Sequence, residues 1–307
     1  MLHQTALSLT PYATSSPPIF GEAPNGAPTC AARTHFYRTR ARKAFRRSER
    51  GLLAGEKTRS VRVLEPYRGS EWPLVGTAGS LRGSRRILVR VGLDDAVRRE
   101  LVSDASDSDP IEIGSAWDPY PSAEARFEAT RAVLRALCET RGLELHLTTR
   151  SPLILRDLDL LRELDLGHSV TVRIPAATLD PRLSRVLEPG TAEPRARLEV
   201  VRCLAADGIA TEVVCDPVLP GINSSADELD PLFAAARDAG AIDLVGDTRI
   251  LRPAGRRRLL AWLRRRFPDR VDAVRRSLGT GSPDAVTGTL RRLRLAYGFP
   301  MLRSGRG

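Results

Sequence analysis

The residue types in this sequence that could do chemistry gather in six short polar segments, each of which follows a run of residues that predicts a β-strand. In α/β barrels and open α/β sheets, functional residues lie at the carboxyl ends of the strands, which meet at one edge of the sheet. An arginine at that edge can bind a carboxylate through two parallel hydrogen bonds. We therefore expect any ligand site to be built from these segments. They are Glu65–Gly69, Ser115–Tyr120, Thr148–Ser151, Ala176–Asp180, Asp216–Asn223 and Asp247–Arg249.

Motifs of the common catalytic classes are absent from the sequence. It contains no G-x-S-x-G, no phosphate-binding loop and no H-E-x-x-H, so the usual hydrolase and nucleotide-binding chemistries have no support. The four cysteines, Cys30, Cys138, Cys203 and Cys215, match neither a metal-ligand spacing nor a disulfide framework. This pattern predicts a reduced, cytoplasmic protein. We see no secretory signal and no apolar run long enough to span a membrane, so a membrane partner is not expected.

The elements that must position the polar segments form a repeating unit of helix, glycine and strand. Strands that start near residues 111, 144, 170, 211 and 242 are 33, 26, 41 and 31 residues apart, which suits βα units of a parallel sheet. With Val61–Leu64 the units number six, and right-handed crossovers then give an open, partial (β/α)6 barrel or a doubly wound sheet. We also expect a strand over Ile87–Val91 and helices over Ser122–Thr140 and Leu153–Leu166.

The ends of the chain differ in composition from this α/β part. We expect a disordered, basic extension over residues 1–58, a barrel over 59–252 and a helical extension over 253–307. The net charge is +11, and because only two of the 48 basic residues are lysines, 46 are arginines. A charge of this size favours contact with polyanions. An arginine bias this strong can equally reflect the nucleotide composition of the coding DNA.

Two basic segments are candidates for nucleic-acid contact. The first is Arg33–Arg50, where cations alternate with aromatic rings, the composition of a nucleic-acid-binding arm. Its candidate cations are Arg38, Arg40, Arg42, Lys43, Arg46 and Arg47. The alternative is a solvated tether that leads into the barrel. The second segment, Arg256–Phe267, predicts a basic amphipathic helix that either lies on nucleic acid or a membrane surface, or packs Trp262 and its leucines on the barrel.

Five segments resemble, in order, one group of the radical S-adenosylmethionine family. This is the group related to spore photoproduct lyase, most members of which have no assigned substrate. The segments are Pro66-Tyr-Arg-Gly69, Trp117-Asp-Pro-Tyr-Pro121, the stretch from Thr149 to Leu161, Thr178-Leu-Asp-Pro181 with Leu187-Glu-Pro189, and the stretch from Pro217 to Asn223. The similarity runs from about Val61 to Asp269. It implies a partial (β/α)6 barrel, a [4Fe-4S] cluster in the loop after the first strand, and S-adenosylmethionine bound over that cluster.

The same resemblance shows where this sequence departs from the family. The family's cluster loop reads PYRG followed by C-x3-C-x2-C, and the three cysteine positions fall here on Ser70, Leu74 and Thr77. Iron in such clusters is held by thiolate, with imidazole as an occasional substitute. A hydroxyl is far harder to deprotonate than a thiol, and leucine has no donor atom. We therefore expect no cluster in this loop and no radical chemistry.

The resemblance also implies a set of ligand contacts. It puts Arg150 near the carboxylate of S-adenosylmethionine, with Ser115, Asp118, Thr149 and Ser151 on the neighbouring rims. The alternative is that Asp118, Arg150, Arg156 and Asp157 form a structural network of ion pairs and caps. Without cluster iron to chelate the methionine amine and carboxylate, we expect the affinity for this ligand to be low.

Three functional hypotheses follow. The first is a degenerate member of the family that lacks radical chemistry and retains weak binding of S-adenosylmethionine or nucleic acid. The second is a cytoplasmic nucleic-acid-binding protein that uses the basic arm and the arginine-rich helix. The third is an active radical S-adenosylmethionine enzyme related to DNA photoproduct repair, which would require a cluster held in an unforeseen way.

Overall fold

Six strands of the chain form one parallel sheet in the order in which they occur in the sequence. The structure, a computed structural model, describes residues 35–50, 59–69, 86–103, 108–246, 253–280 and 283–300. The parallel strands are β3 (Arg59–Leu64), β6 (Ile111–Ile113), β7 (Glu144–Thr148), β8 (Ser169–Pro175), β9 (Thr211–Cys215) and β10 (Asp243–Gly246). A seventh strand, β2 (Arg46–Arg50), pairs antiparallel with β3 at the edge. The sheet is not closed, so the expected partial (β/α)6 barrel is confirmed.

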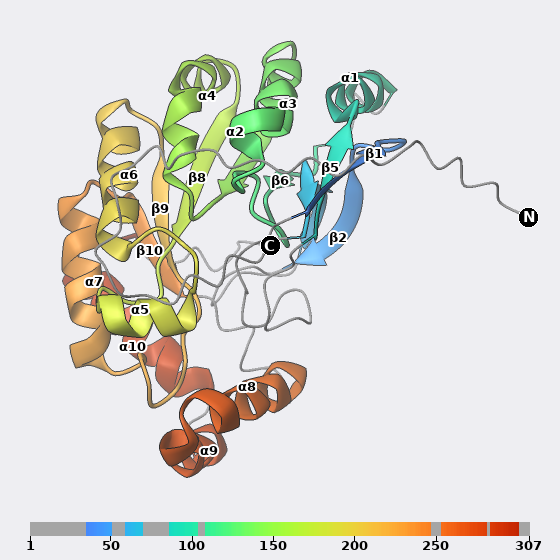
Figure 1. Cartoon of the computed structure of the whole chain (residues 1–307). Helices are drawn as coiled ribbons and strands as arrows, with labels where there is room; N and C mark the ends of the chain where they lie inside the picture. Colours follow the sequence, from blue (N-terminus) through green and yellow to red (C-terminus); the bar gives the residue numbers. More distant parts are fainter. Residues whose placement is uncertain are drawn as a thin grey trace, which may run out of the picture.

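Helices cover the outer face of this sheet (Figure 1). They are α3 (Ala129–Cys138), α4 (Leu158–Asp165), α6 (Pro194–Ala206) and α7 (Ala226–Asp238). Ile113, Leu147 and Val172 are register partners on neighbouring strands, and all three belong to the main apolar core. Burying such a side chain stabilises the fold by about 1.5–3 kcal/mol. The core between sheet and helices therefore fixes the strand register, and with it the positions of the loops at the carboxyl ends.

A second, three-stranded sheet extends the fold beside β3. Its order is β1-β5-β4, from β1 (His35–Arg40), β5 (Arg86–Val91) and β4 (Tyr67–Arg68). Strand β1 runs parallel to β5, and β4 runs antiparallel to it. The expectation of a disordered extension over 1–58 is therefore wrong for residues 35–50, which form β1, β2 and the turn between them. Residues 1–34 and 51–58 lie outside the described residues.

Long-range contacts hold this turn in place. Ala41 and Ala44 are buried. The carboxylate of Glu100, in helix α1 (Leu93–Ser103), accepts hydrogen bonds from the backbone N–H groups of Ala44 (2.7 Å) and Phe45 (3.2 Å). The guanidinium of Arg90 donates to backbone carbonyls of the turn and to the carbonyl of Glu65 (3.1 Å). Glu100 and Arg90 lie about 50 positions further along the chain than the turn they hold. The composition of the segment itself carries no sign of these partners, and it therefore predicted an unfolded arm.

Two of the expected helices are each divided into two shorter elements. The expected helix over 122–140 is divided into α2 (Glu124–Phe127) and α3, because Glu128 between them has a φ of 47°. The Glu124 carboxylate accepts from the N–H groups of Thr130 (2.9 Å) and Arg131 (3.1 Å) in the first turn of α3. The expected helix over 153–166 begins as a 3-10 helix, η1 (Pro152–Asp157), before α4.

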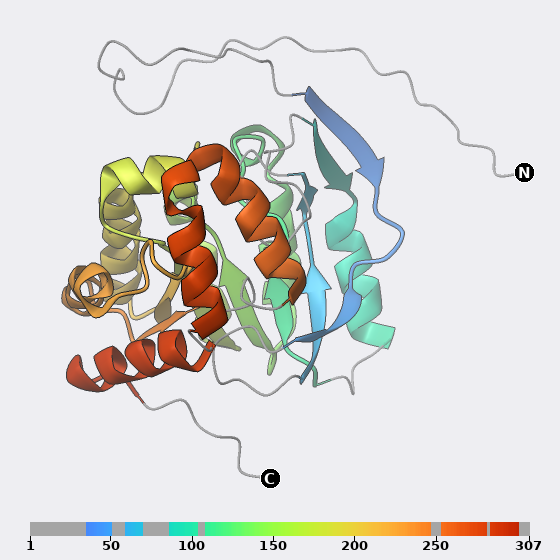
Figure 2. The same cartoon turned by 90° about the horizontal axis from the view of Figure 1, so that it is seen from below.

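The helices near the end of the chain lie at the carboxyl end of the sheet. Helix α5 (Pro181–Leu187), which closely follows β8, marks that end, and α8 (Pro253–Arg266) and α9 (Val271–Thr280) lie at the same end in Figure 1. Figure 2 looks onto it and shows α8 and α9 crossing the molecule there. Val274 of α9 lies against Gly221 in the loop after β9. The 3-10 turn η3 (Pro268–Arg270) joins α8 to α9, and α10 (Pro283–Ala296) packs against α7 and β10.

Helix α8 packs its aromatic side onto the fold, as one of the two alternatives for it predicted. Trp262 is buried in the main core, 5.5 Å from the ring of Phe267, while Arg264, Arg265 and Arg266 are exposed. None of the helices in the described ranges is both long and apolar enough to cross a membrane.

Candidate functional site

The side chain of Asp118 joins the loops that follow β6 and β7. Its carboxylate accepts hydrogen bonds from the hydroxyl of Thr149 (2.7 Å) and from the backbone N–H groups of Arg150 and Tyr120 (2.8 Å each). Burial raises the pKa of Asp118 to about 6, although these three hydrogen bonds act in the opposite direction. The structure thus brings together Asp118, Thr149 and Arg150 of the predicted site at neighbouring strand ends.

The guanidinium of Arg150 is enclosed by carboxylates of the protein. Its Nε donates to Glu188 (3.0 Å) and its Nη2 to Asp216 (2.7 Å), and the residue is 5% exposed. Burial alone would lower the pKa of Arg150, but the charges of Asp216 and Glu188 raise it. Neither Glu188 nor Asp216 belongs to the network of Asp118, Arg150, Arg156 and Asp157 that the structural alternative names. The contact of Arg150 with S-adenosylmethionine stays a prediction.

Glu188 and Arg197 also belong to this buried network, and neither was predicted as a site residue. Arg197 is 1% exposed, and its two terminal nitrogens pair with the two carboxylate oxygens of Glu188 at 2.6 and 2.8 Å. Burial raises the pKa of Glu188, but the charges of Arg197 and Arg150 and their hydrogen bonds bring it below its usual value. The motif Leu187-Glu-Pro189 was the signal that could have identified Glu188.

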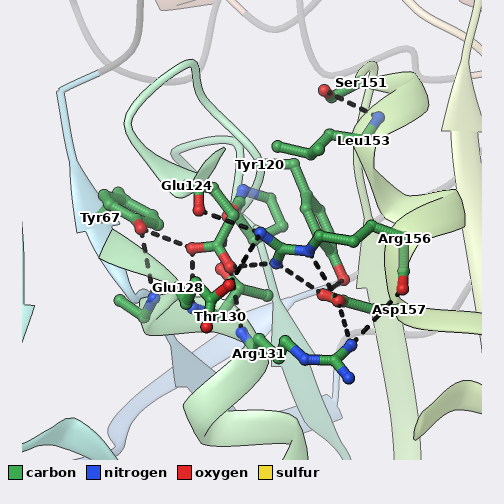
Figure 3. Close-up of polar contacts among 12 residues, drawn as sticks. Tyr67, Tyr120, Glu124, Glu128, Thr130, Arg131, Ser151, Leu153, Arg156 and Asp157 are labelled. Carbon is green, nitrogen blue, oxygen red and sulfur yellow. Dashed lines mark hydrogen bonds and ion pairs between the residues drawn. The ribbon is translucent and has the colours of Figure 1, made fainter. Parts of the chain in front are cut away.

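Ser115 and Ser151 take different places in the site. The hydroxyl of Ser151 accepts from the N–H of Leu153 (3.3 Å) and begins η1 (Figure 3). The Ser151 N–H donates to Thr149 Oγ1 (3.0 Å). Ser151 therefore shapes the loop. The hydroxyl oxygen of Ser115 is buried and has no hydrogen-bond partner among the described residues. The contact of Ser115 with a ligand stays a prediction.

A second network lies beside the first and holds the Pro66–Gly69 segment (Figure 3). The fully buried carboxylate of Glu124 accepts hydrogen bonds from the hydroxyl of Tyr67 and from Arg156 (2.7 Å). Arg156 also donates to Asp157 (2.9 Å). Tyr120 connects the two networks, because its N–H donates to Asp118 and its hydroxyl to Asp157 (3.1 Å). Of the four residues that the structural alternative named, Asp118 and Arg150 lie in the first network and Arg156 and Asp157 in the second, and Tyr120 joins the two networks.

The thiols that the structure describes do not fit an iron–sulfur cluster. Cys138 lies in α3, Cys203 in α6 and Cys215 at the end of β9. Burial raises the pKa of Cys138 to about 11 and also raises the pKa of Cys215. The three thiols lie in different elements, whereas an iron–sulfur cluster needs several thiolates in one place. Within the described ranges, no three His, Cys, Asp or Glu side chains gather as metal ligands would. The positions Ser70, Leu74 and Thr77 lie outside the described residues.

The six candidate cations of the basic arm are all exposed on strands β1 and β2 and the turn between them. Arg38 lies over the ring of Phe127 at 5.5 Å, and Arg47 pairs with Asp109 at 2.7 Å. The other four form no ion pair with another described residue. Those four are Arg40, Arg42, Lys43 and Arg46.

These cations lie at the carboxyl end of the sheet. Arg46 pairs with Val63 near the end of β3, and Arg40 pairs with Val91 at the end of β5. The turn that joins them is bonded through Arg90 to Glu65, the residue that follows β3. The folded basic segment and the Asp118 site therefore share one edge of the sheet.

Comparison with known proteins agrees with this fold. No family model matches the chain. The uncharacterized protein Rv2578c of Mycobacterium tuberculosis is 31% identical over 190 residues, which cover 62% of this chain and 56% of that protein. The uncharacterized protein MJ0683 of Methanocaldococcus jannaschii is 24% identical over 136 residues, or 44% and 49% of the two chains. The chain thus spans about half the length of the curated relatives it matches.

The class of fold is a partial parallel barrel with helices on its outer face. The solved structures that share it include spore photoproduct lyase complexed with dinucleoside spore photoproduct. That structure matches with a TM-score of 0.52 and 18% identity, over 76% of this chain and 66% of that chain. A variant of the same enzyme matches with a TM-score of 0.53 and 17% identity, over 68% and 59%. The chain therefore has the fold of spore photoproduct lyase.

Proposed function

We propose that this chain is a degenerate protein of the radical S-adenosylmethionine fold, which carries out no radical chemistry and binds nucleic acid at the carboxyl end of its sheet. The observation that carries the proposal is the folded basic segment. The backbone that carries its cations is held by hydrogen bonds with Glu100 and Arg90 and by the pairing of β1 and β2. This segment lies beside the loops at the carboxyl ends of the strands, where functional residues of barrel folds are found.

The loss of radical chemistry rests on the residue types of the cluster loop. Hydroxyl groups and a leucine side chain replace the three thiolates at Ser70, Leu74 and Thr77. Iron of a [4Fe-4S] cluster needs soft thiolate ligands. The thiols of the described residues offer no substitute, because each lies in a different element. Arg150, the residue expected near the carboxylate of S-adenosylmethionine, is already neutralised by the carboxylates of Glu188 and Asp216.

Binding of nucleic acid rests on charge and order together. A cation that is already fixed in place loses less conformational freedom on binding a phosphate than one on a flexible arm. The four arginine and lysine side chains without a described ion-pair partner can each neutralise one phosphate and release a counterion. The solved structure of spore photoproduct lyase, which shares the fold, is complexed with a dinucleoside photoproduct, which supports a nucleic-acid ligand for this fold.

A triple substitution tests the binding surface. We expect Arg40→Ser, Arg42→Ser and Arg46→Ser together to weaken binding of a labelled oligonucleotide and to reduce the slope of log Kd against log salt by about 2, since each phosphate contact contributes about 0.7 on a single strand. The matched control replaces three exposed arginines on outer helices, Arg135, Arg195 and Arg202. It removes the same charge and should leave the slope unchanged. Equal slopes for the two triple variants would refute the assigned surface.

Anaerobic reconstitution with iron and sulfide tests the loss of radical chemistry. We expect no stoichiometric iron, no thiolate-to-iron absorbance and no cleavage of S-adenosylmethionine to 5′-deoxyadenosine. S-adenosylmethionine should also raise the melting temperature little, since a ligand stabilises the native state only as far as it binds there. Stoichiometric iron together with 5′-deoxyadenosine would show that the chain is an active radical enzyme.

A further inference from the structure

One aromatic ring at the carboxyl end of the sheet lies outside the apolar clusters that the described residues form. Trp117 lies in the loop after β6 and is half-buried. It belongs to neither of the two apolar clusters that the described residues form. Trp262, by contrast, is 6% exposed and packs in the main core. A large apolar ring that is partly in water and outside the core is typical of a binding surface.

The backbone on both sides of Trp117 is fixed. On one side, Gly114 donates its N–H to the carbonyl of Leu64 (3.4 Å) and adopts a φ of 84°. On the other side, the carboxylate of Asp118 accepts three hydrogen bonds, and the hydroxyl of Thr130 donates to the carbonyl of Pro119. The loop therefore presents the Trp117 ring on a rigid base, which lowers the entropic cost of binding a flat ligand against it.

The surroundings of the ring supply charge and a hydrogen-bonding group. Strand β6, which leads into the loop, pairs with β3, and the other neighbour of β3 is β2, whose first residue is Arg46. The ring and the cations are thus two strands apart on the same edge of the sheet. Two residues before Trp117, the buried hydroxyl of Ser115 has no described partner. A ring, nearby cations and a hydroxyl without a partner among the described residues are elements that a nucleotide site uses.

We infer that Trp117 is a stacking platform for an unpaired base, so that the ligand is single-stranded nucleic acid whose phosphates contact Arg40, Arg42 and Arg46. The inference rests on the proposed function and adds to it the strandedness of the ligand. A base in a duplex is stacked on both faces and offers none to the indole, whereas each base of a single strand has a free face. Stacking tolerates every base, so the site selects for single strands without selecting for sequence.

Binding measured by fluorescence anisotropy on the full chain tests this role. The probes are a labelled single strand, a duplex of the same length, and a single strand in which the bases are replaced by abasic sites. We expect the wild type to bind the single strand more tightly than either of the other probes. Trp117→Ala should weaken binding of the single strand about 5- to 150-fold, as expected for one stacked base. Trp117→Phe, which keeps a ring, should recover most of this loss.

The salt slope separates this inference from the function on which it rests. Trp117→Ala should leave the slope unchanged, because it removes no cation. If the wild type binds with a steep salt slope but Trp117→Ala binds the single strand equally well, the stacking role is refuted and the nucleic-acid surface stands. If no probe binds with salt dependence, the proposed function itself is refuted. Should Trp117→Ala fail to fold, equal affinity of the wild type for the normal and the abasic strand would overturn the inference.

Discussion

Removal of the Glu124 carboxylate should strongly destabilise the fold. This side chain is fully buried and accepts hydrogen bonds from the hydroxyl of Tyr67, from two backbone N–H groups at the start of α3, and from Arg156. Burial and the negative charge of Glu124 raise the pKa of Tyr67, so the phenol stays neutral and donates its proton. Glu124 therefore connects three parts of the structure, β4, α3 and η1, through one carboxylate.

The cost of Glu124→Ala can be worked from these contacts. The substitution leaves the Tyr67 hydroxyl and two buried N–H groups without an acceptor, and each such group costs about 1–3 kcal/mol. Arg156 keeps its hydrogen bonds to Asp157, so its charge is not left alone. Because neighbouring terms are not additive, we expect a total of about 3–5 kcal/mol, the range for breaking a buried ion pair. At an unfolding entropy of about 2.1 cal/mol/K per residue, this loss lowers the melting temperature of a chain of 307 residues by about 5–8 °C.

Urea unfolding followed by circular dichroism measures this loss as a shift of the transition midpoint at constant slope. The matched control is Glu128→Ala, four positions along, where the side chain is 52% exposed and approaches Arg156 only to 4.0 Å. We expect less than about 0.5 kcal/mol for the control, since surface pairs contribute little. If the two variants unfold at the same urea concentration, the Glu124 network does not stabilise the fold.

Three further predictions concern the Asp118 loop and the buried thiol. The pKa of Asp118 is raised to about 6 in the folded state, so the folded state holds this proton more tightly than the unfolded chain. The stabilising contribution of this proton is complete below about pH 4 and is lost as the pH rises through 6. The free energy of unfolding of the wild type relative to Asp118→Asn should therefore fall by about 3 kcal/mol between pH 4 and pH 7. A difference in unfolding free energy that does not change with pH would contradict this. Gly114→Ala should lower the free energy of unfolding by more than about 3 kcal/mol, because a Cβ there would lie 2.4 Å from the carbonyl oxygen of Thr148. The control Gly142→Ala has a similar φ of 79° and open space around the Cβ, so it should cost only about 1 kcal/mol of backbone strain. Equal losses of stability in the two variants would refute the steric reasoning. Burial raises the pKa of the Cys215 thiol. Iodoacetamide at pH 8 should therefore leave Cys215 unmodified in the native protein and modify it in urea. If Cys215 of the native protein is modified as fast as Cys203, the Cys215 thiol is accessible and this prediction is wrong.

The parallel strands were predictable because their signal is local. The apolar runs at Val61–Leu64, Val170–Ile174 and Thr211–Val214 are each preceded by a helix and a glycine or followed by a polar loop, and each forms a strand of the main sheet. Strands β1 and β2 carry no such signal. Their sequence is rich in arginine, and their pairing depends on β5, β3 and Glu100, which lie far along the chain. Composition alone therefore predicted an unfolded arm.

The candidate site was predictable in part for the same reason. Asp118, Thr149 and Arg150 were found because each follows a strand, and the structure joins them at neighbouring strand ends. Glu188, which pairs with Arg150, and Arg197, which pairs with Glu188, were not found, because Glu188 lies beyond α5 and Arg197 within α6, and neither position follows a strand directly. In the sequence, Trp117 is distinguished only as the first residue of the Trp117–Pro121 motif. Its separation from the apolar core is a property of the packing, which the sequence does not contain.

The salt dependence of binding by the unaltered chain, purified and treated with a chelator, is the most direct measurement of the proposed function. With the four cations Arg40, Arg42, Lys43 and Arg46 each contacting one phosphate, log Kd for a labelled single strand should rise with log salt with a slope of about 3. Binding with this slope in the absence of iron is the predicted result. No binding at low salt, or binding that appears only after iron and sulfide are restored, would contradict it.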